Sequence, residues 1–398
     1  MRGDAHLDPF PSPRRLPPEV ARMTADAPLA ASAARARERE YLRVTSVVSH
    51  LLLDVVLFVL FVPVGLAAQL RDLTGGGDTL ASRTLFVAAL LLIHELASLP
   101  VTVMLSYLPN RADGLTKQAP LAWLLDHVVG AAVELTLSAA LFLGLYAVFR
   151  AFPETWLLWS LLPVLVFVAA AYLLAPLVAR LRFRTAPLDD PEVEAVVRDV
   201  FRRADVPLLR VSLWKLASKT RGANAALVPR GRGFEVLVSD TMISSVGVRG
   251  VRIAVAHELG HLVHRDTRRS VVRIVAQFSA TLLAAAALYH LLGTSFGLRG
   301  VTDIATLPIL LLAFTLVGTF GGLVTNVQKR REEFAADRFA LDTTRDPEGF
   351  VELMTTLAKG NLSDPDVPRW IEVWLHDHPS TSRRIEAARA WAAALGDG

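Results

Sequence analysis

Six long apolar stretches constrain the fold of this chain more than any other feature of its sequence. Each is long enough for an α-helix to cross about 30 Å of hydrocarbon at about 1.5 Å per residue. The first four follow one another closely and the last two form a separate pair: Val47–Leu70, Thr84–Tyr107, Leu124–Phe149, Trp156–Val178, Val271–Leu292 and Ala305–Val327. We therefore expect a multi-span α-helical protein of the lipid bilayer.

The composition agrees with a membrane protein and narrows the chemistry. Of the 398 residues, 53% are hydrophobic and only 20% are charged, which is too apolar for an ordinary soluble enzyme. The chain has no cysteine, so disulfides, cysteine zinc fingers and a cysteine nucleophile are excluded, and a metal site would have to use His, Asp and Glu. The net charge of +4 calls for no nucleic-acid partner, because arginines that flank apolar spans account for it.

The distribution of Lys and Arg between successive loops predicts the orientation in the membrane. The basic flanks contain Arg35, Arg37, Arg39, Arg43, Arg111, Lys117, Arg180, Arg182, Arg184, Arg265, Arg268, Arg269, Lys329, Arg330 and Arg331. The opposite loops contain only Arg71, Arg83, Arg150 and Arg299. An even number of spans in each group puts the N-terminus and both soluble parts on one side. We predict that this side is the cytoplasm and that the membrane is the inner membrane of a bacterium.

The spans divide the chain into five parts. We expect a disordered cytoplasmic tail over residues 1–43, a four-span bundle over 44–180, a first soluble part over 181–270, two further spans over 271–328, and a second, helical soluble part over 329–398. Local signals predict mixed α and β structure in the first soluble part. The expected elements are a helix from Asp190 and Pro191 to about Ala204, a strand over Leu209–Leu216, a hairpin of Ala223–Val228 and Phe234–Val238, and a helix to Asp266.

The clearest chemical signal is AVAHELGHLV, residues 254–263. On a helix, His257 and His261 lie on one face, one turn apart, and can bind one ion. Zn²⁺ accepts imidazole nitrogen at about 2.0–2.1 Å. Glu258 can take a proton from an attacking water and pass it to a leaving amine without ligating the metal. The competing interpretation is a buried amphipathic helix with two incidental histidines.

The tripeptide HEL also occurs in LLIHELASLP, residues 91–100, where the context differs. Ser98 occupies the position of the second His, and the segment lies in the middle of a span. Glu95 in this segment, like Asp54 and Glu134, is an acid inside a predicted span. Such acids are costly and are candidates for function, while a hydrogen bond to a neighbouring helix is the simpler interpretation. We assign none of them a catalytic role.

A third metal ligand has two candidates. His264 lies about 10.5 Å along the helix axis from His257 at about 1.5 Å per residue, which is too far for one ion. The better candidate is in KRREEFAADRFA, residues 329–340, where Glu333 and Asp337 share one helical face. Glu333 can ligate zinc, and Asp337 can orient a ligating His by accepting its other N–H. Periodicity alone does not choose Glu333 over Glu332.

Several motifs in a fixed order resemble one protein family. SDTM, VAHELGH, RREEFAADRFA and HPSTSRRI follow one another, with two spans between the second and third. This set resembles the integral-membrane zinc endopeptidases of the type I CAAX prenyl protease family, gluzincins with an HExxH helix and a Glu ligand in EFxAD, which are related to the HtpX proteases. The likeness covers roughly residues 85–390, and four leading spans favour this branch over HtpX, whose membrane part before the motif is shorter. It implies a mostly helical, zincin-like α+β protease domain that carries a small β-sheet.

The resemblance also implies residue roles. The metal would be one Zn²⁺ per chain, held by His257, His261 and Glu333. The other implied roles are the base at Glu258, the acid that orients a ligand at Asp337, stabilisation of the oxyanion by His378 or Arg384, and an edge strand at Asn224 and Ala225 that pairs with the substrate backbone. The chain departs from the family at Arg249, where members often carry an acid, and in having six spans where eukaryotic members have seven.

We therefore expect a zinc metalloendopeptidase that acts on membrane-associated or lipidated peptides or on damaged membrane proteins. An inactive family member serving as a scaffold or chaperone is the alternative, but the base and all three ligands are present. A transporter would be built from inverted repeats, and the sequence has none that we detect.

Overall fold

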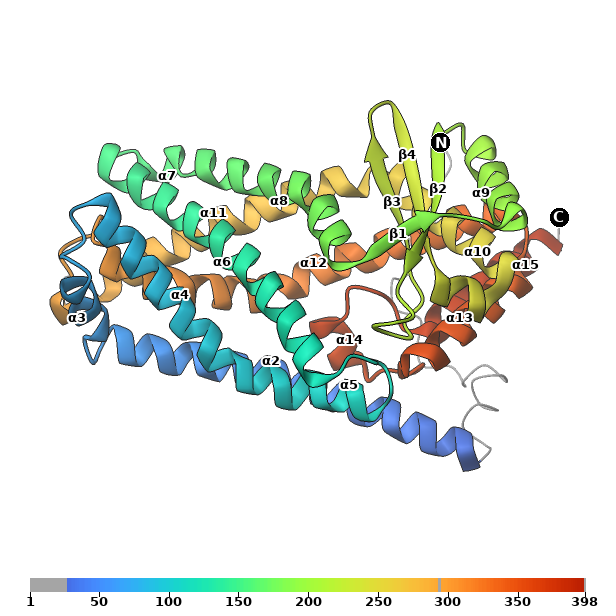
Figure 1. Cartoon of the computed structure of the whole chain (residues 1–398), viewed down its shortest axis with the longest axis horizontal. Coiled ribbons are helices and arrows are strands. Elements are labelled where there is room, and N and C mark those ends of the chain that lie inside the picture. The colour runs from blue at the N-terminus through green and yellow to red at the C-terminus, as the bar shows by residue number, and fades with distance from the viewer. Residues whose placement is uncertain (1–26, 293–294, 397–398) are drawn as a thin grey trace, which may run out of the picture.

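The structure, a computed structural model, describes residues 27–292 and 295–396. Within these residues, six helices are long and apolar enough to cross a membrane. Five of them are α2 (Ala27–Phe61), α4 (Leu80–Thr102), α6 (Pro120–Ala151), α11 (Asp266–Leu292) and α12 (Leu307–Thr344), and the sixth is formed by α7 (Trp156–Trp159) with α8 (Leu161–Arg182). They run side by side along the long axis of the molecule (Figure 1). The predicted multi-span helical class is confirmed.

Short elements join these helices. They are α3 (Leu66–Leu73), η1 (Val103–Tyr107), α5 (Leu108–Ala112), η2 (Ser295–Gly297) and η3 (Ile304–Thr306). The first predicted span, Val47–Leu70, is therefore too long at its end, because α2 stops at Phe61 and Gly65 enters α3 with a φ of 88°. Only a residue without a Cβ takes that left-handed conformation at little cost.

The N-terminal region differs from the expected tail over residues 1–43. From Ala27 onward the chain is helical and continues without a break into the first membrane helix. Residues 1–26 lie outside the described residues. The helical extension is held by ion pairs: Asp113 accepts from Arg35 at 2.7 Å and from Arg39 at 2.6 Å. The sequence pattern could not predict this helical extension, because Asp113, the partner of both arginines, lies more than 70 residues further along the chain.

A four-stranded sheet lies at one end of the molecule. Its strands are β1 (Arg184–Pro187), β2 (Leu208–Lys215), β3 (Ala225–Arg230) and β4 (Gly233–Ser239), in the order β1-β2-β4-β3. The predicted β3–β4 hairpin is confirmed, and β2 pairs with β4 in parallel. The four-residue β1 was not predicted. Because β3 is an edge strand of the sheet, it leaves one row of backbone groups unpaired in the sheet.

The remaining helices complete the soluble part: α9 (Pro191–Arg203), α10 (Asp240–Val263), α13 (Pro347–Asn361), α14 (Arg369–Leu375) and α15 (Thr381–Gly396). The predicted N-terminus of α9 is confirmed, because the Asp190 side chain accepts hydrogen bonds from the first backbone amides of the helix. The helix predicted to continue to Asp266 ends at Val263 instead, and α11 begins at Asp266.

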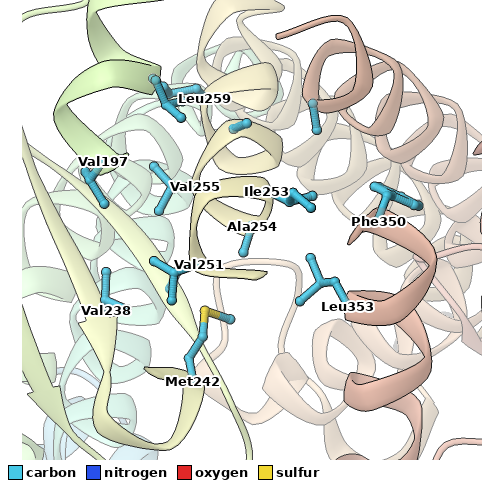
Figure 2. Packing of buried hydrophobic residues seen from close by; sticks show 14 of the residues in the cluster. Val197, Val238, Met242, Val251, Ile253, Ala254, Val255, Leu259, Phe350 and Leu353 are labelled. Carbon is cyan, nitrogen blue, oxygen red and sulfur yellow. The ribbon is translucent and has the colours of Figure 1, made fainter. Parts of the chain in front are cut away.

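Helix α10 lies at the centre of the soluble core. Val251 and Val255 face the sheet and α9, while Ile253 and Ala254 lie towards α13 (Figure 2). Phe350 and Leu353 cover that second side and are almost completely buried. Burial on both sides fixes the helix in place, because close-packed cores resist displacement. The next two turns of the same helix carry His257 and His261.

Candidate metal centre

Three side chains from two helices meet at the end of α10. His257 and His261 extend from α10, and Glu333 extends from the soluble part of α12. One ligand atom from each lies within 4.8 Å of the other two. The two Nε2 atoms are 3.2 Å apart, and the Glu333 carboxylate oxygens lie 3.4 Å from His257 Nε2 and 3.3 Å from His261 Nε2. These three are the only metal-ligating cluster among the described residues.

A small-residue contact brings the two helices this close. A Cβ placed on Gly260 would come within 2.8 Å of the Ala336 Cα, which is closer than real atoms approach. Gly260 is therefore required for the close crossing of α10 over α12. The crossing positions the turn that carries Glu333 against the turn that carries His257 and His261. Ala336 is the small residue of α12 at this contact.

Both imidazoles are fixed by a carboxylate behind them. His257 Nδ1 lies 2.9 Å from Asp337 Oδ1, and His261 Nδ1 lies 2.9 Å from Asp266 Oδ2. Because a carboxylate accepts, each Nδ1 carries its proton and donates. In the neutral ring, each Nε2 then has a lone pair directed towards Glu333.

The second of these carboxylates was missed by the sequence analysis. Asp266 is buried, although it begins the next helix and looks like an ordinary N-terminal acid. It reaches His261 because the chain turns sharply at Arg265, which has a φ of 59°. The available signal was an acid five residues after the second His, a spacing that has meaning only if the helix stops between them.

The residues fit a divalent cation of the zinc type. Glu333 Oε2 is buried and accepts no hydrogen bond within the protein. Burial by itself disfavours a charged imidazole, yet the carboxylates of Asp337 and Glu333 raise the pKa of His257 to about 9. The surroundings therefore stabilise positive charge at this point. Two imidazoles and one carboxylate are a donor set that zinc accepts.

Glu258 lies next to the first histidine and is partly shielded from solvent. Its side chain is partly buried, and burial raises the pKa of the carboxyl above its ordinary value. The neighbouring His257 and His261 act in the opposite direction. A carboxylate with a raised pKa is a better proton acceptor than one in water.

His378 and Arg384 approach the centre from the C-terminal part of the chain. The His378 side chain is exposed, and its Nδ1 lies 3.5 Å from Glu333 Oε1. Arg384 is committed to Asp337, with Nε and Nη2 donating to the two carboxylate oxygens at 2.8 and 2.5 Å. The structure thus brings both predicted residues to the centre. Of the two, His378 makes only long contacts, with Nδ1 3.5 Å from the Glu333 and Asp377 carboxylates.

Asn224 and Ala225 lie where the edge strand begins. The Asn224 amide donates to Ser239 Oγ at 2.9 Å, and its carbonyl accepts from the Ser239 amide at 3.0 Å. Both of these bonds go to the β4 side. Asn224 is exposed and Ala225 is buried. The opposite edge of this short segment is the edge at which an extended peptide can add.

Three neighbouring residues lie outside the centre. Glu332, the alternative to Glu333, pairs with Arg273 at 2.6 Å on α11. His264 caps the end of α10 with its ring 6.2 Å from Phe339, away from the three ligand atoms. Arg249, which replaces the expected acid, pairs with Asp346 at 2.5 Å and joins α10 to the start of α13.

The acids of the membrane part form separate pairs. Asp54 lies 2.8 Å from His94 Nε2 and accepts from Thr315 at 2.8 Å, which joins three membrane helices. Glu95 lies 2.8 Å from His127 Nε2. Glu134 is exposed on α6. None of these residues contributes to the three-residue cluster, so the second HEL tripeptide is not part of it.

Comparison with known proteins gives consistent results. The sequence model of peptidase family M48 matches residues 187–392, and the model described as "CAAX prenyl protease N-terminal, five membrane helices" matches residues 11–180. An uncharacterized metalloprotease YhfN of Bacillus subtilis is 24% identical over 308 residues, which cover 76% of this chain and 72% of that protein. A protease HtpX homolog of Streptococcus gordonii is 22% identical over 221 residues, which cover 50% of this chain and 73% of that protein.

A solved structure shares the fold. The crystal structure of Ste24p from S. mikatae superposes with a TM-score of 0.69 at 17% sequence identity, and the match covers 80% of this chain and 79% of that one. At this identity the likeness concerns the fold alone. It covers both the membrane helices and the soluble part.

Proposed function

The chain belongs to peptidase family M48, and from this premise we propose which of its residues hydrolyse the peptide bond. It is a zinc-dependent metalloendopeptidase integral to the membrane, as the family and the six apolar helices together show. The observation that carries the residue assignment is the convergence of His257, His261 and Glu333 within 4.8 Å of one another.

The metal is one zinc ion per chain, held by His257, His261 and Glu333. Asp337 and Asp266 hold the two imidazoles with Nε2 towards Glu333, where they would bind the ion, and Arg384 holds Asp337 in turn. When bound, zinc supplies Lewis-acid chemistry, because it acidifies water and polarises a carbonyl oxygen. The buried oxygen of Glu333 that lacks a hydrogen bond supports this assignment.

Glu258 moves the proton. Its carboxylate accepts a proton from the attacking water and delivers it to the amine of the leaving peptide, which is then expelled as a neutral group. The raised pKa supports both halves of this transfer, since the group must gain and then lose the proton near neutral pH.

His378 stabilises the negative oxygen that develops on the scissile carbonyl. Its exposed imidazole next to Glu333 supports this role over Arg384, whose Nε and Nη2 donate to Asp337. Donors preorganised for such an oxygen typically contribute about 10²- to 10³-fold in kcat. Asn224 and Ala225 bind the substrate backbone as an added strand, which fixes the register of the scissile bond.

The substrates are peptides or proteins at the membrane, either membrane-associated or lipidated peptides or damaged membrane proteins. The centre lies where α10 ends, next to the start of the membrane helix α11 and on the soluble extension of the membrane helix α12, and this supports cleavage close to the bilayer surface. The basic loops support a cytoplasmic centre in a bacterial inner membrane. No observation favours the inactive scaffold, because the ligand set and the base are complete.

The test compares the wild-type protein with Glu258→Gln. We expect the wild type with zinc to cleave a casein or lipopeptide reporter, and we expect the variant to lose at least about 100-fold in kcat/KM. The variant should retain its zinc, measured by elemental analysis. Comparing protein N-termini in cells that carry each form then identifies the substrates. A variant as active as the wild type would contradict the assignment of the base.

A further inference from the structure

The loop that carries His378 is anchored on both sides of this residue. His378 itself is largely exposed, so few contacts of its own fix its position. On one side, the Ser380 amide donates to the buried carboxylate of Glu372 at 3.0 Å. On the other side, the His376 amide donates to the Glu372 carbonyl at 3.2 Å. The position of His378 therefore depends on what holds His376 and Glu372.

One anchor of this loop is the first membrane helix. His376 Nε2 lies 2.8 Å from Glu40 Oε2, and Glu40 is only 4% exposed. When Nε2 carries the proton, it donates to the Glu40 carboxylate, and Arg43 Nη1 lies 3.1 Å from the same nitrogen. Arg43, one turn further along α2, lies 3.4 Å from the same carboxylate oxygen. An unpaired buried carboxylate would be costly, so the burial of Glu40 requires these partners.

The second anchor is α12, the helix that carries Glu333. Arg330 donates to the carbonyls of Glu372 at 2.9 Å and His376 at 2.6 Å. Asn326 donates to the Trp374 carbonyl at 2.9 Å. The loop thus lies between α12 and the soluble end of α2, with α14 against α2 (Figure 1).

The anchor on α2 is part of a rigid element. The helix is continuous from Ala27 to Phe61, so Glu40 and the intramembrane Asp54 move together. Asp54 accepts from Thr315 on α12 at 2.8 Å, and Arg39 at the soluble end of α2 pairs with Asp113 at 2.6 Å. The first membrane helix is therefore held by contacts at several points along its length, and its soluble end contacts the loop that carries His378.

We propose that Glu40 is a positioning residue for peptide hydrolysis, which acts through His376 to hold His378 beside the scissile bond. The proposal rests on the role of His378 in the proposed function. It assigns the soluble end of the first membrane helix to the active-site assembly, although this segment is far from the metal ligands in sequence.

The test is a matched pair of substitutions on one helix. Glu40→Ala removes the buried carboxylate, and Glu38→Ala removes an exposed one that pairs only with Arg35 among the described contacts. We expect Glu40→Ala to lower kcat about 10- to 100-fold, as a displaced group does, with KM and bound zinc unchanged. Glu38→Ala should have wild-type kcat. Glu40→Gln, which keeps an accepting oxygen for His376, should restore most of the activity.

A double substitution decides whether Glu40 acts through His378. In a His378→Ala background, Glu40→Ala should cause no further loss, because the group that it positions is gone. An equal loss in both backgrounds, a loss of zinc, or an equal effect of Glu38→Ala would overturn the proposal. If Glu40→Ala does not accumulate, His376→Ala makes the same test from the loop, since Arg330 binds only the backbone of His376.

A measurement without turnover separates this proposal from the proposed function. In the Glu258→Gln background, Glu40→Ala should accelerate amide hydrogen exchange over residues 372–380, and Glu38→Ala should not. Unchanged exchange in that loop would overturn the anchoring by Glu40 whatever the activity of the protein. Faster exchange in Glu40→Ala would support the anchoring of the loop by Glu40 even if the wild type did not hydrolyse peptides. In that case the proposed function would be contradicted and the anchoring would stand.

Discussion

The carboxylate of Asp266 holds the imidazole of His261 from behind, as Asp337 holds that of His257. The two pairs have the same Nδ1–oxygen distance of 2.9 Å. Such partners fix the tautomer and the ring plane of a ligand, and removing one typically costs about 10- to 100-fold in metal affinity.

Asp266→Asn therefore tests whether the Asp266 carboxylate orients His261 for metal binding. We expect zinc affinity, measured by competition with a chromophoric chelator, to fall about 10-fold or more. Asp199→Asn is the control, because Asp199 pairs only with exposed arginines on α9. Equal affinities of the Asp266 variant and the wild type would mean that His261 needs no orienting partner.

At the scale of elements, the crossing of α10 over α12 brings the ligands together. Gly260→Ala would insert a methyl group 2.8 Å from the Ala336 backbone, which cannot rotate away. We expect a loss of about 1–3 kcal/mol in stability, as for other overpacked cores, and weaker zinc binding because Glu333 shifts. Thermal unfolding and zinc content measure both effects.

Gly322→Ala is the matched control for this substitution. Gly322 also lies inside a helix, α12, but a Cβ there meets nothing within 4 Å. Stability in this variant should be unchanged or slightly increased, because alanine favours the helix over glycine. If both alanine variants behaved alike, close packing would not be the reason for Gly260.

The pair of Arg249 and Asp346 links α10 to α13 and predicts a pH dependence. The hydrogen bond from Arg249 holds the pKa of Asp346 below its ordinary value. A lowered folded-state pKa contributes stability that is present above the unfolded pKa and is lost as the pH falls through the folded one. Arg249→Gln should thus lower stability at pH 7 by less than about 1 kcal/mol, since the arginine is half exposed.

The difference in stability between wild type and Arg249→Gln should then begin to shrink as the pH falls below about 4, where Asp346 of the unfolded chain becomes protonated, and should vanish once the pH passes the lowered pKa of the folded state. Thermal unfolding of both proteins at several pH values measures this difference in stability. Arg198→Gln on α9 provides a comparison, because it removes an exposed pair within one helix. A difference that stays constant down to low pH would contradict the ion-pair explanation.

At the scale of the whole molecule, the six helices place the soluble parts at one end (Figure 1). The native chain has no cysteine, so a single introduced cysteine reports its side of the membrane without background. We expect Asp78→Cys, in the loop before α4, to react with an impermeant maleimide in intact cells. Lys359→Cys, at the end of α13, should react only after permeabilisation. The reverse result would place the metal centre outside the cytoplasm.

The sequence alone determined the membrane class, the six spans, the family and the metal-binding motif. The spans and the motif depend on local information, namely the length of apolar runs and residues one helical turn apart, and the family depends on the order of several such motifs. The position of Glu333 was predicted through a family resemblance, because periodicity fitted Glu332 equally well. The structure separates the two, because Glu333 lies with His257 and His261 while Glu332 pairs with Arg273 on another helix.

Tertiary structure alone decided the contacts between distant segments. Asp266 and His261 meet because α10 stops at a sharp turn, and Glu40 meets His376 because two helices more than 300 residues apart pack together. A polar residue at a helix start or in a basic segment has the same local pattern whether it faces water or a partner. Its role is fixed only when packing removes the water, because a buried carboxylate must then find a donor.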